Sequence, residues 1–184
     1  MVAVSGGAAS VVASSLGVGS HSLTAVYSGD ANHNSGTSAA VMVSVTKARA
    51  SVTVASSLNP SVAGQGVTFT ATVSPSAAAG TVQFLDGSNS LGTATLSGGM
   101  ASLSTSSLAA GAHSITAVYS GTANYNGATS SAVSQSVLNA TTSAISGNKS
   151  TVSEGQAVTF TATVAPAAAR RRFRFRRWRS AATR

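Results

Sequence analysis

Residues 67–73 read VTFTATV, an unbroken alternation of apolar and hydroxyl side chains. Because successive side chains of a β-strand point to opposite faces, this pattern predicts a strand with one buried and one solvated face. Residues 114–119, SITAVY, combine β-branched and aromatic side chains in the same manner, and Val82, Phe84 and Leu91 form another inward-facing set. Turn signals separate these runs at Asn59-Pro60, Ser74-Pro75, Asp86-Gly87, Ser97-Gly98-Gly99 and Ala110-Gly111. About seven short strands in roughly 90 residues predict an antiparallel β-sandwich.

The chain repeats itself around this strand. VTFTATV returns at residues 158–164, 91 residues later, and HSLTAVYSG at 21–29 returns 92 residues later as HSITAVYSG at 113–121. SGGAAS at 5–10 and ANHN at 31–34 recur at 97–102 and 123–126 as SGGMAS and ANYN. The repeat unit is therefore 91–92 residues long. The predicted organisation is the second half of a repeat at 1–47, a complete repeat at 48–139, the first third of another at 140–169, and a separate tail at 170–184.

Composition narrows the class of protein. Of 184 residues, 8% are charged, which excludes a coiled coil, and 43% are hydrophobic, which argues against charge-rich disorder. No apolar run is long enough for a transmembrane helix, and no signal peptide is visible at residues 1–7. The absence of Cys excludes a disulfide framework and a thiolate metal site.

In combination, several short motifs of the complete repeat are specific. They are Asn59-Pro60-Ser61, Gly64-Gln65, GTVQF at 80–84, Asp86-Gly87, Leu91-Gly92, Gly111, His113 and VYSG at 118–121. Over residues 1–169 the sequence resembles the bacterial immunoglobulin-like (Ig-like) repeat domains that occur in tandem in large cell-surface and secreted proteins. The resemblance implies an all-β fold of tandem Ig-like antiparallel sandwiches that acts as a spacer, stalk or adhesive module. It also implies an extracellular or cell-surface location and neighbouring repeats as partners, with no catalytic or cofactor-binding residues.

The residues themselves also predict no enzyme. His21 and His113 occupy equivalent repeat positions, which favours a structural role, and no Ser lies in a nucleophile elbow. Gly17-Val18-Gly19 and Gly64-Gln65-Gly66 precede strand patterns, whereas a phosphate-binding loop precedes a helix. Tyr27 and Tyr119 have two interpretations: a tyrosine corner, or a core aromatic with an exposed hydroxyl.

Residues 30–34, DANHN, have the spacing at which a calcium loop begins, but its Gly and terminal Glu are absent. The equivalent residues 122–126, TANYN, have no carboxylate. We therefore expect a turn stabilised by Asn side chains, with calcium as the alternative.

The tail contains all of the excess charge. Residues 1–169 carry three basic and three acidic side chains, so the net charge of +8 arises from eight Arg in residues 170–184. Seven of them alternate with Phe173, Phe175 and Trp178: Arg170, Arg171, Arg172, Arg174, Arg176, Arg177 and Arg179. If this tail is genuine, the interleaving favours binding of nucleic acid or an anionic membrane.

A shifted reading frame is the competing interpretation of the tail. Residues 171–182 stand where positions 80–91, GTVQFLDGSNSL, should recur. Read one base later, the codons for these residues permit GAVSVSDGGAAL, in which Gly arises from the single Trp codon; the agreement ends at the next position. Genomic DNA in which the shifted frame does not resume the repeat would contradict this interpretation.

The incomplete repeats raise a packing problem. We expect residues 48–139 to be ordered, the tail to be disordered, and the two partial repeats to leave open sheet edges and an uncovered apolar face. Early strands of the third repeat pairing with late strands of the first, within or between chains, would relieve this.

Overall fold

A computed structural model describes residues 1–166, and these contain only β-strands. The chain divides into two units, Met1–Val137 and Leu138–Arg184. The strands of the first unit are β1 (Gly19–Leu23), β2 (Val26–Tyr27), β3 (Gly36–Thr37), β4 (Val41–Val45), β5 (Ser51–Ser56), β6 (Ser61–Val62), β7 (Val67–Ser74), β8 (Thr81–Asp86), β9 (Asn89–Thr95), β10 (Met100–Thr105), β11 (Gly111–Tyr119), β12 (Ala128–Thr129) and β13 (Val133–Leu138, which ends one residue into the second unit). The second unit contains β14 (Thr142–Gly147) and β15 (Phe160–Ala165). No helix that could cross a membrane occurs in residues 1–166.

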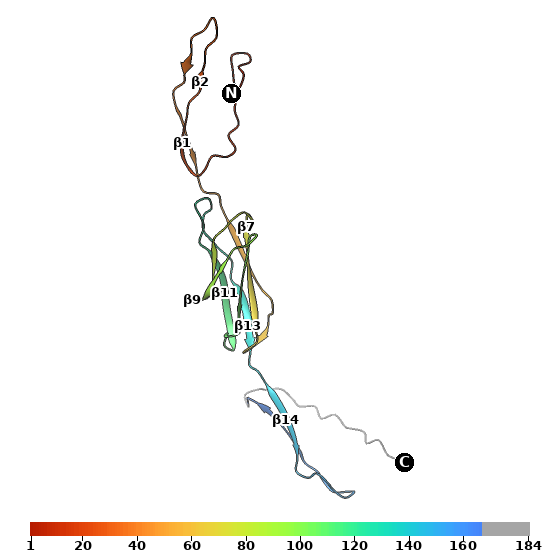
Figure 1. Ribbon diagram of the computed structural model, residues 1–184. Helices are drawn as coiled ribbons and strands as arrows, with labels where there is room; N and C mark the ends of the chain where they lie inside the picture. The colour runs from red at the N-terminus through yellow and green to blue at the C-terminus, as the bar shows by residue number, and fades with distance from the viewer. Residues whose placement is uncertain (167–184) are drawn as a thin grey trace, which may run out of the picture. The chain divides into compact units, whose positions relative to one another are not determined.

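Strands β5 to β13 form a sandwich of two sheets, which we call the central sandwich (Figure 1). One sheet has the order β10-β7-β5 and the other β6-β13-β11-β8-β9, with β12 added to β11. The fold is therefore all-β, as the strand pattern predicts. The hairpin signal at Asp86-Gly87 connects β8 to β9, and Gly87 has the positive φ of 57° that this turn requires.

Alternation along the strands determines the core of the central sandwich. In β7, Val67, Phe69, Ala71 and Val73 are buried, whereas the threonines between them face outward or lie at intermediate depth. Facing β7 across the sandwich, Val82, Phe84, Ile115, Ala117 and Tyr119 are also buried. The predicted one-face burial of residues 67–73 is confirmed, as is the inward direction of Val82 and Phe84.

Residues 1–47, the N-terminal segment, pair in the same register as the end of the central sandwich. Strand β1 pairs with β4 so that Gly19 faces Val45, and the counterparts 92 residues later, Gly111 and Val137, face each other in β11 and β13. The β2–β3 pairing likewise repeats the β11–β12 pairing. Repeated sequence therefore produces repeated local structure, although residues 24–25 interrupt the strand that is continuous in β11.

Residues 140–166, the C-terminal segment, repeat the start of the central sandwich. In the β14–β15 hairpin, Thr142 faces Ala165, as Ser51 faces Ser74 in β5 and β7. No apolar side chain of either segment is buried, and several are open to solvent: Phe160 is 59% exposed and Tyr27 is 39% exposed. The uncovered apolar faces expected from the sequence are thus present. The expected disorder of residues 170–184 falls outside the described residues.

Candidate functional site

The turn that follows β11 is closed by one glycine and one hydroxyl. Gly121 has a φ of +79°, and a Cβ at this position would lie 2.7 Å from the backbone nitrogen of Gly127. Thr122 N–H donates to the Tyr125 carbonyl at 2.9 Å, and Thr122 Oγ1 accepts from the N–H groups of Asn124 and Tyr125 at 3.3 Å each. We call residues 121–126 the central turn.

The central turn holds the segment through which the chain enters the sandwich. Ala48 N–H donates to the Asn124 carbonyl at 2.9 Å, and Asn126 N–H donates to the Ala48 carbonyl at the same distance. Lys47 Nζ donates to the Thr122 carbonyl at 2.8 Å. Three hydrogen bonds therefore fasten the entering residues to the sandwich before β5 begins.

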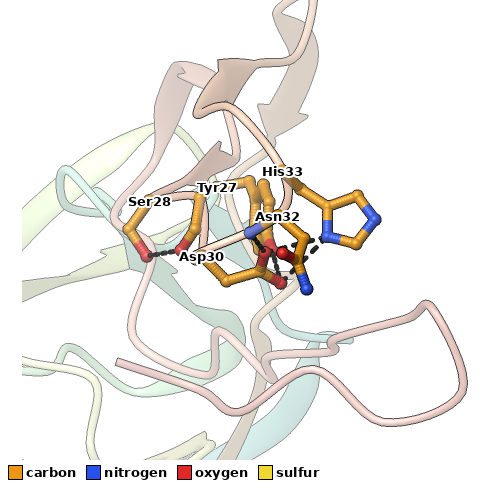
Figure 2. Close-up of polar contacts among 6 residues, drawn as sticks. Tyr27, Ser28, Asp30, Asn32 and His33 are labelled. Carbon is orange, nitrogen blue, oxygen red and sulfur yellow. Dashed lines mark hydrogen bonds and ion pairs between the residues drawn. The ribbon is translucent and has the colours of Figure 1, made fainter.

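The equivalent turn of the N-terminal segment, residues 29–34, is built around a carboxylate (Figure 2). Asp30 Oδ1 accepts from Asn32 N–H at 2.8 Å and lies 2.8 Å from His33 Nδ1, and Tyr27 Oη donates to Oδ2 at 2.9 Å. These hydrogen bonds lower the pKa of Asp30, and the largest contribution comes from the Asn32 N–H. The hydrogen bond to Asp30 raises the pKa of Tyr27. The side chain that closes this turn is Asp30, not the Asn side chains expected from the sequence.

Tyr119 agrees with the first interpretation of the repeated tyrosine in that its hydroxyl bonds to the backbone near the end of a strand. Its ring is buried, 1% exposed, and its hydroxyl donates to the Ala79 carbonyl at 2.9 Å. That acceptor lies in the loop just before β8, 40 residues earlier in the chain. Tyr119 is therefore a core aromatic with a paired hydroxyl, and Tyr27 bonds to Asp30 instead.

His113 bridges two acceptors. Its Nδ1 lies 2.7 Å from Asp86 Oδ2, and its Nε2 lies 2.8 Å from the Ala109 carbonyl. Because a carboxylate and a carbonyl can only accept, both ring nitrogens must carry protons to make both bonds. The Ala109 carbonyl, and next the Asp86 carboxylate, raise the pKa of His113. The equivalent His21 keeps the contact to a carbonyl, that of Gly17 at 2.7 Å.

We expect the central sandwich to lose stability as the pH rises through the pKa of folded His113. The folded pKa is raised above the unfolded one, so this stabilisation is complete below the unfolded value near 6.5 and is lost above the folded value. The free energy of unfolding should fall by about the contribution of one hydrogen bond, about 1 kcal/mol. Urea unfolding of wild type and His113→Gln between pH 5.5 and 9 measures it. A wild-type pH dependence that survives in His113→Gln would contradict the assignment.

A buried amide was not anticipated from the sequence. Gln135 is 0% exposed, and its Nε2 donates to the Leu58 carbonyl at 2.9 Å and to Ser61 Oγ at 3.1 Å. Its Oε1 accepts from Ser56 Oγ at 2.6 Å. The only signal was a polar residue at an inward position of the alternating run VSQSV at 133–137. The network joins β5, β6 and β13, so its role is to position strands.

The remaining candidates offer little concentrated chemistry. A hollow of about 260 Å³ on the outer face of β8, β9 and β11 is lined by Thr81, Gln83, Thr93, Val118 and Ser120. Within residues 1–166, no three His, Asp or Glu side chains come together to hold a metal ion. Arg170, Arg171, Arg172, Arg174, Arg176, Arg177 and Arg179, the residues predicted to bind nucleic acid or membrane, lie outside the described residues.

Comparison with known proteins identifies the central part of the chain. Residues 52–138 match the family described as bacterial Ig-like domain (group 3). No curated protein matches the chain. Among solved structures, the chain is similar to the fibronectin(III)-like modules of Clostridium thermocellum CbhA, with 19% identity and a TM-score of 0.40. The match covers 66% of this chain and 63% of that one. The resemblance to bacterial Ig-like domains drawn from the sequence is confirmed over residues 52–138.

Proposed function

We propose, from the bacterial Ig-like domain at residues 52–138, that this chain is a non-enzymatic structural module of a bacterial surface or secreted protein. Its task is to act as a spacer or stalk, to which adhesion can be added by exposed loops. Bacterial Ig-like domains are typically found in extracellular and surface proteins, which supports this location. The partners that this function requires are neighbouring repeats.

Tandem organisation is supported by the two conserved registers. Strands β1 to β4 pair as β11 to β13 do, and β14 and β15 pair as β5 and β7 do. We therefore interpret residues 1–47 and 140–169 as partial Ig-like repeats on either side of the complete repeat 48–139.

The position of entry and exit is the observation that favours a spacer most. The chain enters at Ala48, on the turn beyond Tyr119, and leaves after Val137, which pairs with Gly111. Gly111 and Tyr119 are the two ends of β11, and a strand of this length spans about 27 Å. Each such repeat therefore adds the length of the sandwich to the distance between its neighbours.

Single-molecule stretching of the chain between two terminal handles tests the proposal. A spacer should resist extension and then unfold in one cooperative event that releases about 30 nm, the contour length of one repeat less its folded length. Extension of the chain without such an unfolding event would contradict the proposed spacer function. Binding of the chain to cells in the same preparation would identify an adhesive function in addition.

The hydrogen bonds at the entry give a second prediction. Ala48→Pro removes the N–H that donates to the Asn124 carbonyl, and should lower the free energy of unfolding by about 1 kcal/mol. Ala48→Ser retains the N–H and should behave as wild type. Chemical denaturation followed by circular dichroism compares the three chains. Equal stability of all three would show that the entry bonds do not stabilise the sandwich.

The tail supports a second candidate function, because the net charge of +8 arises there. If the tail binds nucleic acid or an anionic membrane, deletion of residues 170–184 should abolish binding to single-stranded DNA and to phosphatidylserine vesicles. The affinity of the intact chain should also fall steeply with salt. Binding that survives the deletion would exclude this function.

A further inference from the structure

Both flanking segments expose side chains that the central sandwich buries. Phe160 is 59% exposed, whereas its counterpart Phe69 is 0% exposed. On the N-terminal segment, Val4 and Tyr27 are 53% and 39% exposed, against 8% and 1% for Leu96 and Tyr119. Within residues 1–166, no second sheet covers either of these apolar faces.

The two flanking segments correspond to different parts of the repeat. By the repeat offset, the N-terminal segment corresponds to residues 93–139 and the C-terminal segment to residues 49–75. In the central sandwich these two parts form one core: β10 pairs with β7, and β5 and β7 pack over β11 and β13. The N-terminal segment therefore presents the surface against which a segment like 140–166 packs.

The strands that neither segment supplies lie at an edge. They are the counterparts of β8 and most of β9, and the order β6-β13-β11-β8-β9 places them at the end of one sheet. If the two segments were joined, one sheet would contain the counterparts of all three strands β10, β7 and β5. The other would contain the counterparts of β6, β13 and β11 as neighbours, without a gap. The cost is the loss of the counterparts of Val82 and Phe84 from the core.

Side chains that would meet across the joint are matched in polarity. In the central sandwich, buried Gln135 bonds to Ser61 and Ser56. At the corresponding positions the N-terminal segment has Val43, and the C-terminal segment has Val152 and Gly147. An amide and two hydroxyls are thus replaced together by apolar side chains and a hydrogen, so none of these three side chains is retained without its side-chain partner.

The turn of the N-terminal segment has backbone groups free for the incoming chain. The Asn32 carbonyl and the Asn34 N–H correspond to the groups that hold Ala48, and neither makes a hydrogen bond within residues 1–166. Residues 139–140, which precede β14, would take the place of Ala48 there.

Two segments of one chain cannot meet in this way. They are attached at opposite ends of the central sandwich, about 27 Å apart along β11. The linker at 138–141 spans at most about 14 Å, and the linker at 46–50 is partly fastened to the central turn. Of the two ways to bring these segments together, within one chain or between two, the structure therefore favours contact between two copies.

We propose that residues 140–166 of one chain pack onto residues 1–47 of a second copy and form a sandwich between the two molecules that lacks only the counterparts of β8 and most of β9. The contact is heterologous, so it joins chains head to tail and leaves a free segment at each end. Association therefore continues to oligomers whose size rises with concentration.

A cysteine pair tests the joint, since the chain has no Cys of its own. In the central sandwich Ser102 faces Thr70 across β10 and β7, with 3.1 Å between their hydroxyl oxygens. The corresponding pair across the joint is Ser10 and Thr161. Mild oxidation of Ser10→Cys/Thr161→Cys should give a ladder of disulfide-linked dimers and larger species.

The matched control is Ser10→Cys/Ala162→Cys. Residue 162 points to the opposite face of its strand, so cross-linking should fall at least tenfold. Equal cross-linking of both variants, a disulfide confined to single chains, or no disulfide at all would overturn the proposal.

Sedimentation of the intact chain gives an independent test. The average mass should rise with concentration, and Phe160→Asp should restore a monomer because it places a carboxylate in the joint. The melting of the central sandwich, which Phe160 does not enter, should be unchanged in this variant. Association that persists in Phe160→Asp, or a monomeric wild type at high concentration, would refute the head-to-tail joint.

Discussion

Replacing Phe69 by Ala should lower the free energy of unfolding of the central sandwich by about 3–5 kcal/mol. Phe69 is 0% exposed and belongs to the cluster that joins the two sheets, so truncation removes buried apolar surface and leaves a cavity. A domain of this size is stable by only about 5–15 kcal/mol, so the variant should be close to unfolding. Urea denaturation followed by circular dichroism measures the loss.

The repeat itself supplies the control for this prediction. Phe160 stands in the same local sequence, VTFTATV, but its side chain is 59% exposed. Phe160→Ala should therefore leave the unfolding of the central sandwich unchanged in dilute solution. Similar losses from Phe69→Ala and Phe160→Ala would mean that both strands are buried to the same extent.

Gly121→Ala should destabilise the central sandwich by at least about 2 kcal/mol, the second large effect. Gly121 has a φ of +79°, a conformation that is unfavourable for residues with a side chain. The Cβ of an alanine at this position would lie 2.8 Å from the Tyr125 carbonyl oxygen. Relief of this clash must shift the backbone of the central turn and with it the groups that hold Lys47 and Ala48. Thermal unfolding of the variant measures the effect.

Two other glycines separate the causes of this loss. The Cβ added by Gly66→Ala has no atom within 4 Å, and Gly66 does not have a positive φ, so this substitution should not change the stability of the central sandwich. Gly29→Ala repeats the clash in the N-terminal segment and should not change the melting of the central sandwich. A neutral Gly121→Ala would show that the central turn adjusts without cost.

The local pattern of apolar and polar residues was sufficient to predict the strands and their buried faces. The alternation in residues 67–73 predicted which side chains of β7 are buried. The sequence repeat predicted which parts of a repeat the two segments represent, and β1 and β14 pair as their counterparts do. These features depend on neighbouring residues and on side-chain period, both of which are explicit in a sequence. The resemblance to bacterial Ig-like domains rested on the same motifs and is confirmed for residues 52–138.

Contacts between distant residues were not predictable in this way. The partner of the Tyr119 hydroxyl is 40 residues away, and the carboxylate that bonds to His113, that of Asp86, is 27 residues away. The two turns, alike in sequence, are closed differently, by Asp30 in one and Thr122 in the other. Which polar groups pair depends on which strands the fold brings together, and a single sequence gives no record of that.

By itself, the sequence determined the all-β class, the length of the repeat and the faces of its strands, because these follow from the spacing of apolar side chains along the chain. The local sequence does not distinguish Phe69, which is buried, from Phe160, which is exposed, because the two lie in identical heptapeptides; only the tertiary structure decides the burial of each. A strand turns one side chain in two toward a core, but that core exists only where a second sheet covers it. Residues 48–139 supply both sheets, and each flanking segment supplies one side of a core.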